Sequence, residues 1–266
     1  MSERVISDPA GRKFLYYLNL ATNTAPEAAP TLIVFHGWNG AASNQISGER
    51  GLGDPDWNTV FPLDYFGFNR MGSWYLGENG DYFVVDFIDR MIEELRSELG
   101  FSGEFYTYGS SMGGFGAALH GIRHKVPAMV LDIPQTCLLG NVYGRYHAEK
   151  LKKVFGESVV EAVNSLGDLD VYHGDPAVKR YCDLSTLIGE SDKDYRPIAY
   201  IKQSRFDQSD GGGGNSYYQQ QTHRLLGALI DREIPFRLVV DNVNAHKTTW
   251  NMWDAMKFIS EGGEGH

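Results

Sequence analysis

The most informative stretch of this chain covers residues 104–116, Glu-Phe-Tyr-Thr-Tyr-Gly-Ser-Ser-Met-Gly-Gly-Phe-Gly. An aromatic run typical of a strand enters a Gly-Ser-Ser-Met-Gly turn, and a helical segment rich in small residues leaves it. G-x-S-x-G between a strand and a helix is the context in which this motif indicates a nucleophilic serine. The turn forces Ser111 into a rarely allowed backbone conformation, so Gly109 and Gly113 must leave room for the facing backbone. We therefore expect the Ser111 hydroxyl to lie exposed above a sheet edge, at the N-terminus of a helix.

On both sides of this turn, predicted strands alternate with predicted helices. Residues 21–30 and 41–62 are polar and rich in turn-forming residues, which predicts loops. Strands alternating with helices favour a doubly wound α/β fold, with a mainly parallel sheet and helices on both faces. The strands are expected at residues 12–20, 31–35, 65–69, 105–108, 128–133, 198–202 and 236–240, and the helices at 81–99, 114–121, 148–166, 217–232 and in the last 20 residues.

We expect a single domain over residues 1–266, because the sequence contains no repeat and no segment that resembles a linker between domains. The alternation of strands and helices breaks between residues 135 and 195, where a helical stretch lies among irregular segments. This interval predicts an insertion that forms a small helical cap over the sheet.

Composition limits the classes of partner. The formal net charge is −10 and the lysines and arginines do not cluster, which argues against nucleic acid or an anionic membrane surface. No stretch has the length and apolarity of a signal peptide or a membrane span, so a cytoplasmic protein is expected, although a chain with its leader removed would look the same. Cys137 and Cys182 have no metal-ligand spacing and are expected to be buried thiols; we expect no metal and no organic cofactor.

The order of three side chains along the sequence matches the chemistry of the turn. A serine hydroxyl needs a base within hydrogen-bond reach, and that base needs an orienting group. Proteins with this turn place the acid after the serine and the histidine last, and here Asp207 and His246 follow Ser111, each near the end of a predicted strand. Asp210 and Asp132 are alternatives for the acid, because they also lie close to strand ends.

With these motifs in place, the chain resembles the α/β-hydrolase family from residue 12 to about residue 259. The resemblance rests on Phe35-His36-Gly37-Trp38, on Gly109-Ser110-Ser111-Met112-Gly113-Gly114, on a strand-end Asp207 and on a late His246.

This resemblance implies a role for each of these residues. Ser111 would be the nucleophile, His246 the general base and acid, and Asp207 the group that orients His246. The backbone N–H groups of Met112 and Trp38 would form the oxyanion hole. The role of Met112 also agrees with physical chemistry. Amides in the first turn of a helix are unpaired and lie at the positive end of the helix dipole, which favours negative charge.

The substrate side is indicated by residues 64–82, which are aromatic, polar and punctuated by glycine. Arg70, Trp74 and Tyr75 could line a cleft, and aromatic faces with scattered hydrogen-bonding groups suit sugars or aromatic acyl groups. Packing of this loop onto the sheet is an equal alternative. The Gly-Ser-Trp-Tyr-Leu-Gly segment at residues 72–77 is similar to segments in bacterial enzymes that acetylate surface polysaccharides and glycoproteins on the same fold.

These observations predict a serine esterase that acts through an acyl-enzyme on a small-molecule or glycan ester. One alternative is acyl transfer to a carbohydrate hydroxyl, which shares the acyl-enzyme and differs only in the acceptor. An alternative of another class is a catalytically inactive protein that binds a ligand or a partner. The sequence does not indicate an oligomeric state.

Overall fold

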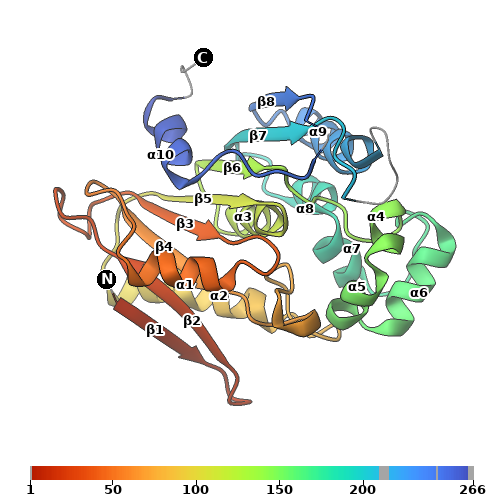
Figure 1. Cartoon of the computed structure of the whole chain (residues 1–266), viewed down its shortest axis with the longest axis horizontal. Coiled ribbons are helices and arrows are strands. Elements are labelled where there is room, and N and C mark those ends of the chain that lie inside the picture. The colour runs from red at the N-terminus through yellow and green to blue at the C-terminus, as the bar shows by residue number, and fades with distance from the viewer. Residues whose placement is uncertain (1, 210–215, 244, 263–266) are drawn as a thin grey trace.

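The computed structural model describes residues 2–209, 216–243 and 245–262. Within these residues, one eight-stranded sheet has helices on both of its faces (Figure 1). The strand order across the sheet is β1-β2-β4-β3-β5-β6-β7-β8. The strands are β1 (Ser2–Ser7), β2 (Lys13–Asn19), β3 (Thr31–Phe35), β4 (Asn58–Leu63), β5 (Phe105–Ser110), β6 (Ala128–Asp132), β7 (Ile198–Ser204) and β8 (Phe236–Asp241).

Strands β1, β2 and β4 form antiparallel pairs at one edge of the sheet, and every pair from β4 through β3 to β8 is parallel. The predicted doubly wound, mainly parallel α/β fold is therefore confirmed. Because the carboxyl ends of parallel strands meet at one edge, the segments that follow β3, β5, β6, β7 and β8 are brought together there.

The helices divide between the two faces. A larger apolar cluster contains side chains from α2, α3, α8 and α9, and a smaller cluster on the other face contains side chains from α10. The helices are α1 (Ala41–Glu49), α2 (Phe83–Glu93), α3 (Met112–Arg123), α4 (Val142–Tyr146), α5 (Ala148–Phe155), α6 (Glu157–Leu166), α7 (Pro176–Cys182), α8 (Leu184–Glu190), α9 (Arg224–Asp231) and α10 (Met252–Ser260), with short segments η1 (Phe68–Arg70), η2 (Glu94–Glu98) and η3 (Tyr218–His223).

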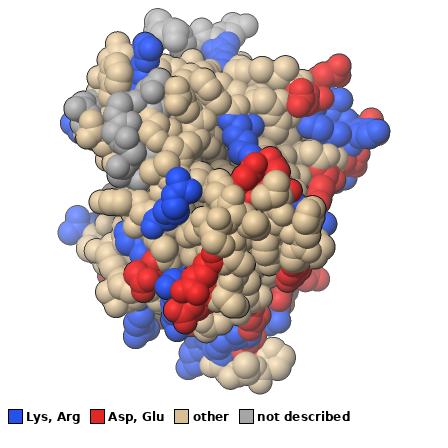
Figure 2. All heavy atoms as spheres, turned by 90° about the vertical axis from the view of Figure 1, so that its right-hand side faces the viewer, with Lys and Arg blue, Asp and Glu red and all other residues tan. Residues whose placement is uncertain are grey.

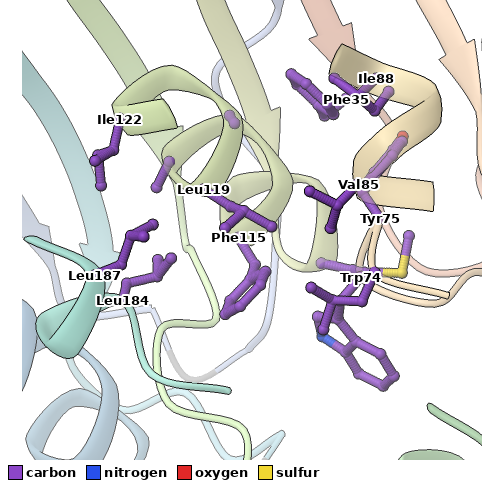
Figure 3. Close-up of a cluster of buried hydrophobic side chains, with 14 of the residues drawn as sticks. Phe35, Trp74, Tyr75, Val85, Ile88, Phe115, Leu119, Ile122, Leu184 and Leu187 are labelled. Atoms are coloured by element: carbon purple, nitrogen blue, oxygen red, sulfur yellow. The ribbon is translucent and has the colours of Figure 1, made fainter. Parts of the chain in front are cut away.

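Helix α3, which follows the serine turn, lies at the centre of the larger cluster. Figure 3 shows Val85 and Ile88 of α2 on one side of it and Leu184 and Leu187 of α8 on the other. Eleven of its twelve residues are buried. Burying a large apolar side chain contributes about 1.5–3 kcal/mol, so the helix that carries the turn is held firmly against the sheet.

Three sequence expectations are wrong, and one strand was not expected. Residues 41–62 do not form one loop, because they contain α1 and β4, and residues 65–69 form no strand but lead into η1. Strand β1 was not expected at all. The expected helix at 148–166 is divided at Gly156, whose φ of 88° breaks it into α5 and α6.

Helices α4 to α7 lie between β6 and β7 in the chain and gather beyond the carboxyl ends of the strands (Figure 1). Helix α8 packs against α3 instead. We propose that α4 to α7 are the small cap predicted for residues 135–195. Cys137 and Cys182 are buried free thiols. None of the helices in the described part of the chain is long and apolar enough to cross a lipid bilayer.

Candidate active site

The turn between β5 and α3 has the strained geometry expected from its sequence. Ser111 has φ 55° and ψ −120°, a backbone conformation that residues other than glycine rarely adopt. A Cβ atom on Gly109 would lie 2.0 Å from the carbonyl oxygen of Gly113, and one on Gly113 would lie 2.2 Å from that of Phe35. Both glycines are therefore required by close backbone approach, and the turn presents Ser111 at the N-terminus of α3.

The structure brings Ser111, His246 and Asp207 together in one chain of contacts. Ser111 Oγ lies 2.6 Å from His246 Nε2, and His246 Nδ1 contacts Asp207 Oδ2. Asp207 is fully buried, and its other oxygen accepts a hydrogen bond from the backbone N–H of Ser209 at 2.9 Å. A carboxylate only accepts, so Nδ1 carries the ring proton and Nε2 is left to accept the proton of the serine hydroxyl.

The other two carboxylates considered from the sequence have different positions. Asp132 accepts hydrogen bonds from the backbone N–H groups of Thr249 and Trp250, at 2.8 and 3.0 Å. It therefore fixes the segment that follows His246. Asp210 lies outside the described residues.

Gln135 is a site residue that the sequence did not indicate. Its Nε2 donates to Ser111 Oγ at 3.2 Å, and its Oε1 accepts from Trp74 Nε1 at 2.5 Å. Because the indole N–H can only donate, it fixes which end of the Gln135 amide faces the serine. The available signal was positional: Gln135 follows Pro134 just after β6, the strand beside β5.

Two backbone amides beside Ser111 are suited to binding an anion. Met112 is the first residue of α3, and Trp38 follows Gly37, where an added Cβ would lie 3.9 Å from the Cβ of Ser111. Within the described part of the chain, neither the Met112 nor the Trp38 N–H donates to another protein group. Unpaired amides at a helix N-terminus favour negative charge, so this geometry is compatible with the predicted oxyanion hole.

A buried imidazole supports the Gly37–Trp38 segment. His36 Nδ1 donates to the carbonyl of Gly37 at 2.8 Å, and its Nε2 accepts from the backbone N–H of Asp64 at 2.9 Å. The backbone N–H of His36 donates to the Tyr75 hydroxyl at 2.8 Å. Burial lowers the pKa of His36 to about 4, so this ring is neutral near pH 7.

Asp64 holds the loop that carries Trp74. Its fully buried carboxyl accepts hydrogen bonds from the backbone N–H groups of Phe66, Ser73 and Tyr75, at 3.2, 2.7 and 2.8 Å. Burial raises the pKa of Asp64 to about 6, although these hydrogen bonds act in the opposite direction. The loop is fixed firmly enough to hold Trp74 and Tyr75 at positive φ, 56° and 58°.

A cavity of about 160 Å³ opens beside the serine. Of the three residues predicted to bind substrate, Trp74 lines this cavity. Tyr75 is fully buried and Arg70 is exposed on η1, and neither lines the cavity. The lining residues are Trp38, Trp74, Ser111, Gln135, Tyr143, His147, Lys150, Ser209 and His246.

A second cluster of titratable groups lies at the other end of α3, where potential ligand atoms of Asp89, His120 and His124 fall within 4.8 Å of one another. Asp89 already accepts from His124 Nε2 at 2.8 Å and from Arg123 at 2.5 Å. His120 is fully buried and stacks on Phe35. A metal ion here would have to compete with the Arg123 guanidinium, so we interpret the cluster as a structural ion-pair network.

Comparisons with known proteins agree with this architecture. No protein-family model matches the chain, and no curated protein matches it. Solved structures do match over nearly the whole chain. An S-formylglutathione hydrolase from Agrobacterium tumefaciens is 14% identical, with a TM-score of 0.60 over 98% of this chain and 91% of that one. The serine hydrolase FphF of Staphylococcus aureus is 15% identical, with a TM-score of 0.60 over 100% and 98%.

The capsule O-acetyltransferase of Neisseria meningitidis serogroup A is also similar, at 15% identity and a TM-score of 0.56 over 95% of this chain and 91% of that one. Together with the sheet topology and the serine turn, these matches show that the chain has the α/β-hydrolase fold. Its structural neighbours include hydrolases and esterases.

Proposed function

We propose that this protein is a serine hydrolase that cleaves carboxylic esters through an acyl-enzyme. The observation that carries the proposal is the 2.6 Å contact between Ser111 Oγ and His246 Nε2, with Asp207 on the other ring nitrogen. A serine hydroxyl is a poor nucleophile unless a base removes its proton during attack, and this contact provides one.

In the proposed reaction, His246 takes the hydroxyl proton as Ser111 attacks the acyl carbonyl. The negative charge that develops on the carbonyl oxygen is stabilised by the N–H groups of Met112 and Trp38. Loss of one such donor typically costs about 3–4 kcal/mol of transition-state stabilisation. His246 then gives its proton to the leaving alcohol, and water releases the acid by the same steps, with His246 again acting first as base and then as acid.

Gln135 supports this reaction as a positioning residue. Its amide donates to the oxygen of Ser111 while that oxygen's own proton faces His246. The Trp74 indole prevents the amide from turning its oxygen toward the serine, which would repel a developing alkoxide. We propose that Trp74 serves the site in this way as well as forming a wall of the cavity.

A panel of p-nitrophenyl esters from acetate to palmitate tests the proposal. The cavity of about 160 Å³ is small, so we expect turnover of acetate to butyrate esters and little of palmitate. Ser111→Ala should abolish the activity. Absence of turnover with every ester, or full activity in Ser111→Ala, would contradict the proposal.

A second candidate function is transfer of an acyl group to a carbohydrate hydroxyl. It is supported by the structural likeness to a capsule O-acetyltransferase and by the paired Trp38 and Trp74 rings, 5.1 Å apart at the cavity, because aromatic faces suit sugars. The test is product analysis with an acetyl donor, with and without a glycan acceptor. Acetylated glycan formed in preference to acetate would favour transfer, and release of acetate unaffected by acceptor would favour hydrolysis.

A further inference from the structure

One positively charged side chain lines the cavity beside the candidate triad. Lys150 of α5 is the only lysine or arginine among the described residues that form its wall. Its Nζ lies 4.8 Å from the centre of the Trp38 ring. An aromatic face stabilises an ammonium group without neutralising it, so the charge remains available to whatever enters the cavity.

Among the described residues, Lys150 has no acidic partner, unlike its neighbours on the same helix. Lys152 lies 3.1–3.3 Å from carboxylate oxygens of Glu149, Glu157 and Glu161, and Lys153 lies 3.8 Å from Glu78. Across the part of the chain that the structure describes, no carboxylate and no other acceptor binds Lys150 Nζ. Lys150 is half-buried, and burial lowers its pKa.

With respect to the described residues, the placement of this charge is unfavourable unless a ligand supplies a counter-ion. A partly dehydrated ammonium group that lacks a counter-ion loses hydration and gains no ion pair. The chain as a whole is acidic, with a net charge of −10, and on the face that carries α4 to α7 the basic side chains are scattered among acidic ones instead of forming a patch (Figure 2). Attraction for an anion at this site therefore depends on a local group inside the cavity, not on a general basic surface.

We propose that Lys150 binds a negatively charged group of the substrate, so that the preferred substrates are anionic esters. This inference rests on the proposed ester chemistry, because it concerns the same cavity. Ser111 and Lys150 line one small space, so the anionic group must be only a few bonds from the scissile carbonyl. It could belong to the acyl half or to the alcohol half of the ester, and the experiment below separates the two.

The kinetic test uses ester pairs that match in shape and differ in charge. For the acyl half, mono-p-nitrophenyl succinate is compared with p-nitrophenyl pentanoate; for the alcohol half, 4-acetoxybenzoate is compared with 4-acetoxybenzamide. In Lys150→Gln, the ratio of kcat/KM for the anionic ester to that for the neutral ester should fall about tenfold or more in one pair, mainly through KM. Lys150→Glu should lower it further.

Lys153→Gln is the matched control, because it removes a lysine charge from the same helix outside the cavity wall. Its charge ratio should stay within about twofold of the wild-type value. If Lys150→Gln and Lys153→Gln change the ratio equally in both pairs, the charge effect is long-range and the assignment of Lys150 is wrong.

A binding measurement separates failure of this inference from failure of the proposed function. Calorimetry with Ser111→Ala protein and the stable amide analogue succinic acid mono-anilide needs no turnover. We expect it to bind more tightly than neutral butyranilide, and Lys150→Gln in the same background should remove the difference. If the two bind equally while the wild-type protein hydrolyses esters, the function stands and the inference falls. If the anionic analogue binds through Lys150 but no ester is cleaved, the anion-binding role of Lys150 stands, while the proposed hydrolysis and the preference for anionic ester substrates fall.

Discussion

Helix α3 has a histidine–aspartate pair at each end, and only one of them has the surroundings for catalysis. At the N-terminal end, His246 contacts buried Asp207 and faces Ser111 across a cavity. At the C-terminal end, His124 Nε2 lies 2.8 Å from Asp89, which also accepts from Arg123. The contacts are similar in kind. The difference lies in the serine hydroxyl that His246 also contacts and in the backbone groups near each pair.

The helix itself provides part of that difference. Its N-terminus offers unpaired N–H groups and the positive end of the dipole, whereas its C-terminus offers carbonyl oxygens. Burial of Asp89 opposes its ionisation, but the hydrogen bonds from His124 and Arg123 outweigh burial and keep the pKa of Asp89 below its usual range. Asp89 and Arg123 therefore form an ion pair between α2 and α3, to which His124 adds a hydrogen bond. A histidine–aspartate pair therefore indicates catalysis only together with a nucleophile and an anion site.

Removing each histidine gives the largest expected contrast. His246→Ala should lower kcat for ester hydrolysis by a factor on the order of 10⁶, because the base and the proton donor are lost together. His124→Ala should leave kcat within a few-fold and lower only the free energy of unfolding. Steady-state kinetics measures kcat for both variants, and urea denaturation measures their free energies of unfolding. Comparable losses of kcat in the two variants would break the comparison.

The carboxylates give the next contrast. Asp207→Asn should lower kcat by roughly 10⁴, since an amide in place of the carboxylate favours the wrong tautomer of His246. Asp89→Asn should retain activity and lower the free energy of unfolding by about 1–2 kcal/mol, a modest value because the side chain is 33% exposed. Asp132→Asn is a useful control for the acid assignment. A greater loss of kcat there than in Asp207→Asn would show that the wrong carboxylate was chosen.

Acid stability should depend on a histidine that belongs to neither pair. His36 has its pKa lowered to about 4 in the folded state, against about 6.5 when unfolded. Between these values the unfolded chain binds the proton and the folded protein does not, so acidification from pH 6.5 to 4 should remove up to about 3 kcal/mol of stability. His36→Gln, followed by urea denaturation across this range, should have a flatter profile.

Asp64 acts with the opposite sign. Its pKa is raised to about 6, so the folded protein binds that proton more readily than the unfolded chain, and stability from this group increases as the pH falls below 6. The difference between the wild-type and His36→Gln profiles is therefore the meaningful quantity, because the Asp64 contribution is common to both. A variant profile as steep as that of the wild type would show that His36 is not the group responsible.

The smallest effect expected concerns the orientation of Gln135. Gln135→Leu should lower kcat about tenfold, the scale of one neutral hydrogen bond. Trp74→Phe should cause a similar loss, because the Gln135 amide can then turn its oxygen toward Ser111. The double variant should lose little more than either single variant, since both act on one contact. Fully additive losses would mean that Trp74 acts only as a wall of the cavity.

The parts of the fold that were predictable from the sequence have a local physical cause. The strand at residues 31–35 was expected from a continuous β-branched and apolar run, and the structure has β3 there. The serine turn was expected because only glycine at positions 109 and 113 leaves room for the facing backbone. The structure has close backbone contacts at both positions. His246 and Asp207 were placed by their order in the chain and by the strands that precede them.

The parts that escaped prediction depend on distant contacts. Helix α1 has no apolar stripe, because it buries Asn44 and Gly48: the Asn44 side chain donates to the carbonyls of Val34 and Pro62, and Gly48 touches Tyr17. Strand β4 contains Pro62, which normally argues against a strand, but its pairing with β3 ends at Val60, before the proline.

Gln135 escaped for the same reason. Only the fold brings its amide to a serine 24 residues earlier in the chain.

The most direct test of the account is labelling by a fluorophosphonate probe, followed by mass spectrometry of the modified peptide. Such probes react with a serine only when a neighbouring base activates it. The account predicts labelling of wild-type protein on Ser111, no labelling of Ser111→Ala and strongly slowed labelling of His246→Ala, with His124→Ala labelled at the wild-type rate. A wild-type protein that resists the probe, or a Ser111→Ala variant labelled as fast as the wild type, would contradict it and favour a ligand-binding protein without hydrolase activity.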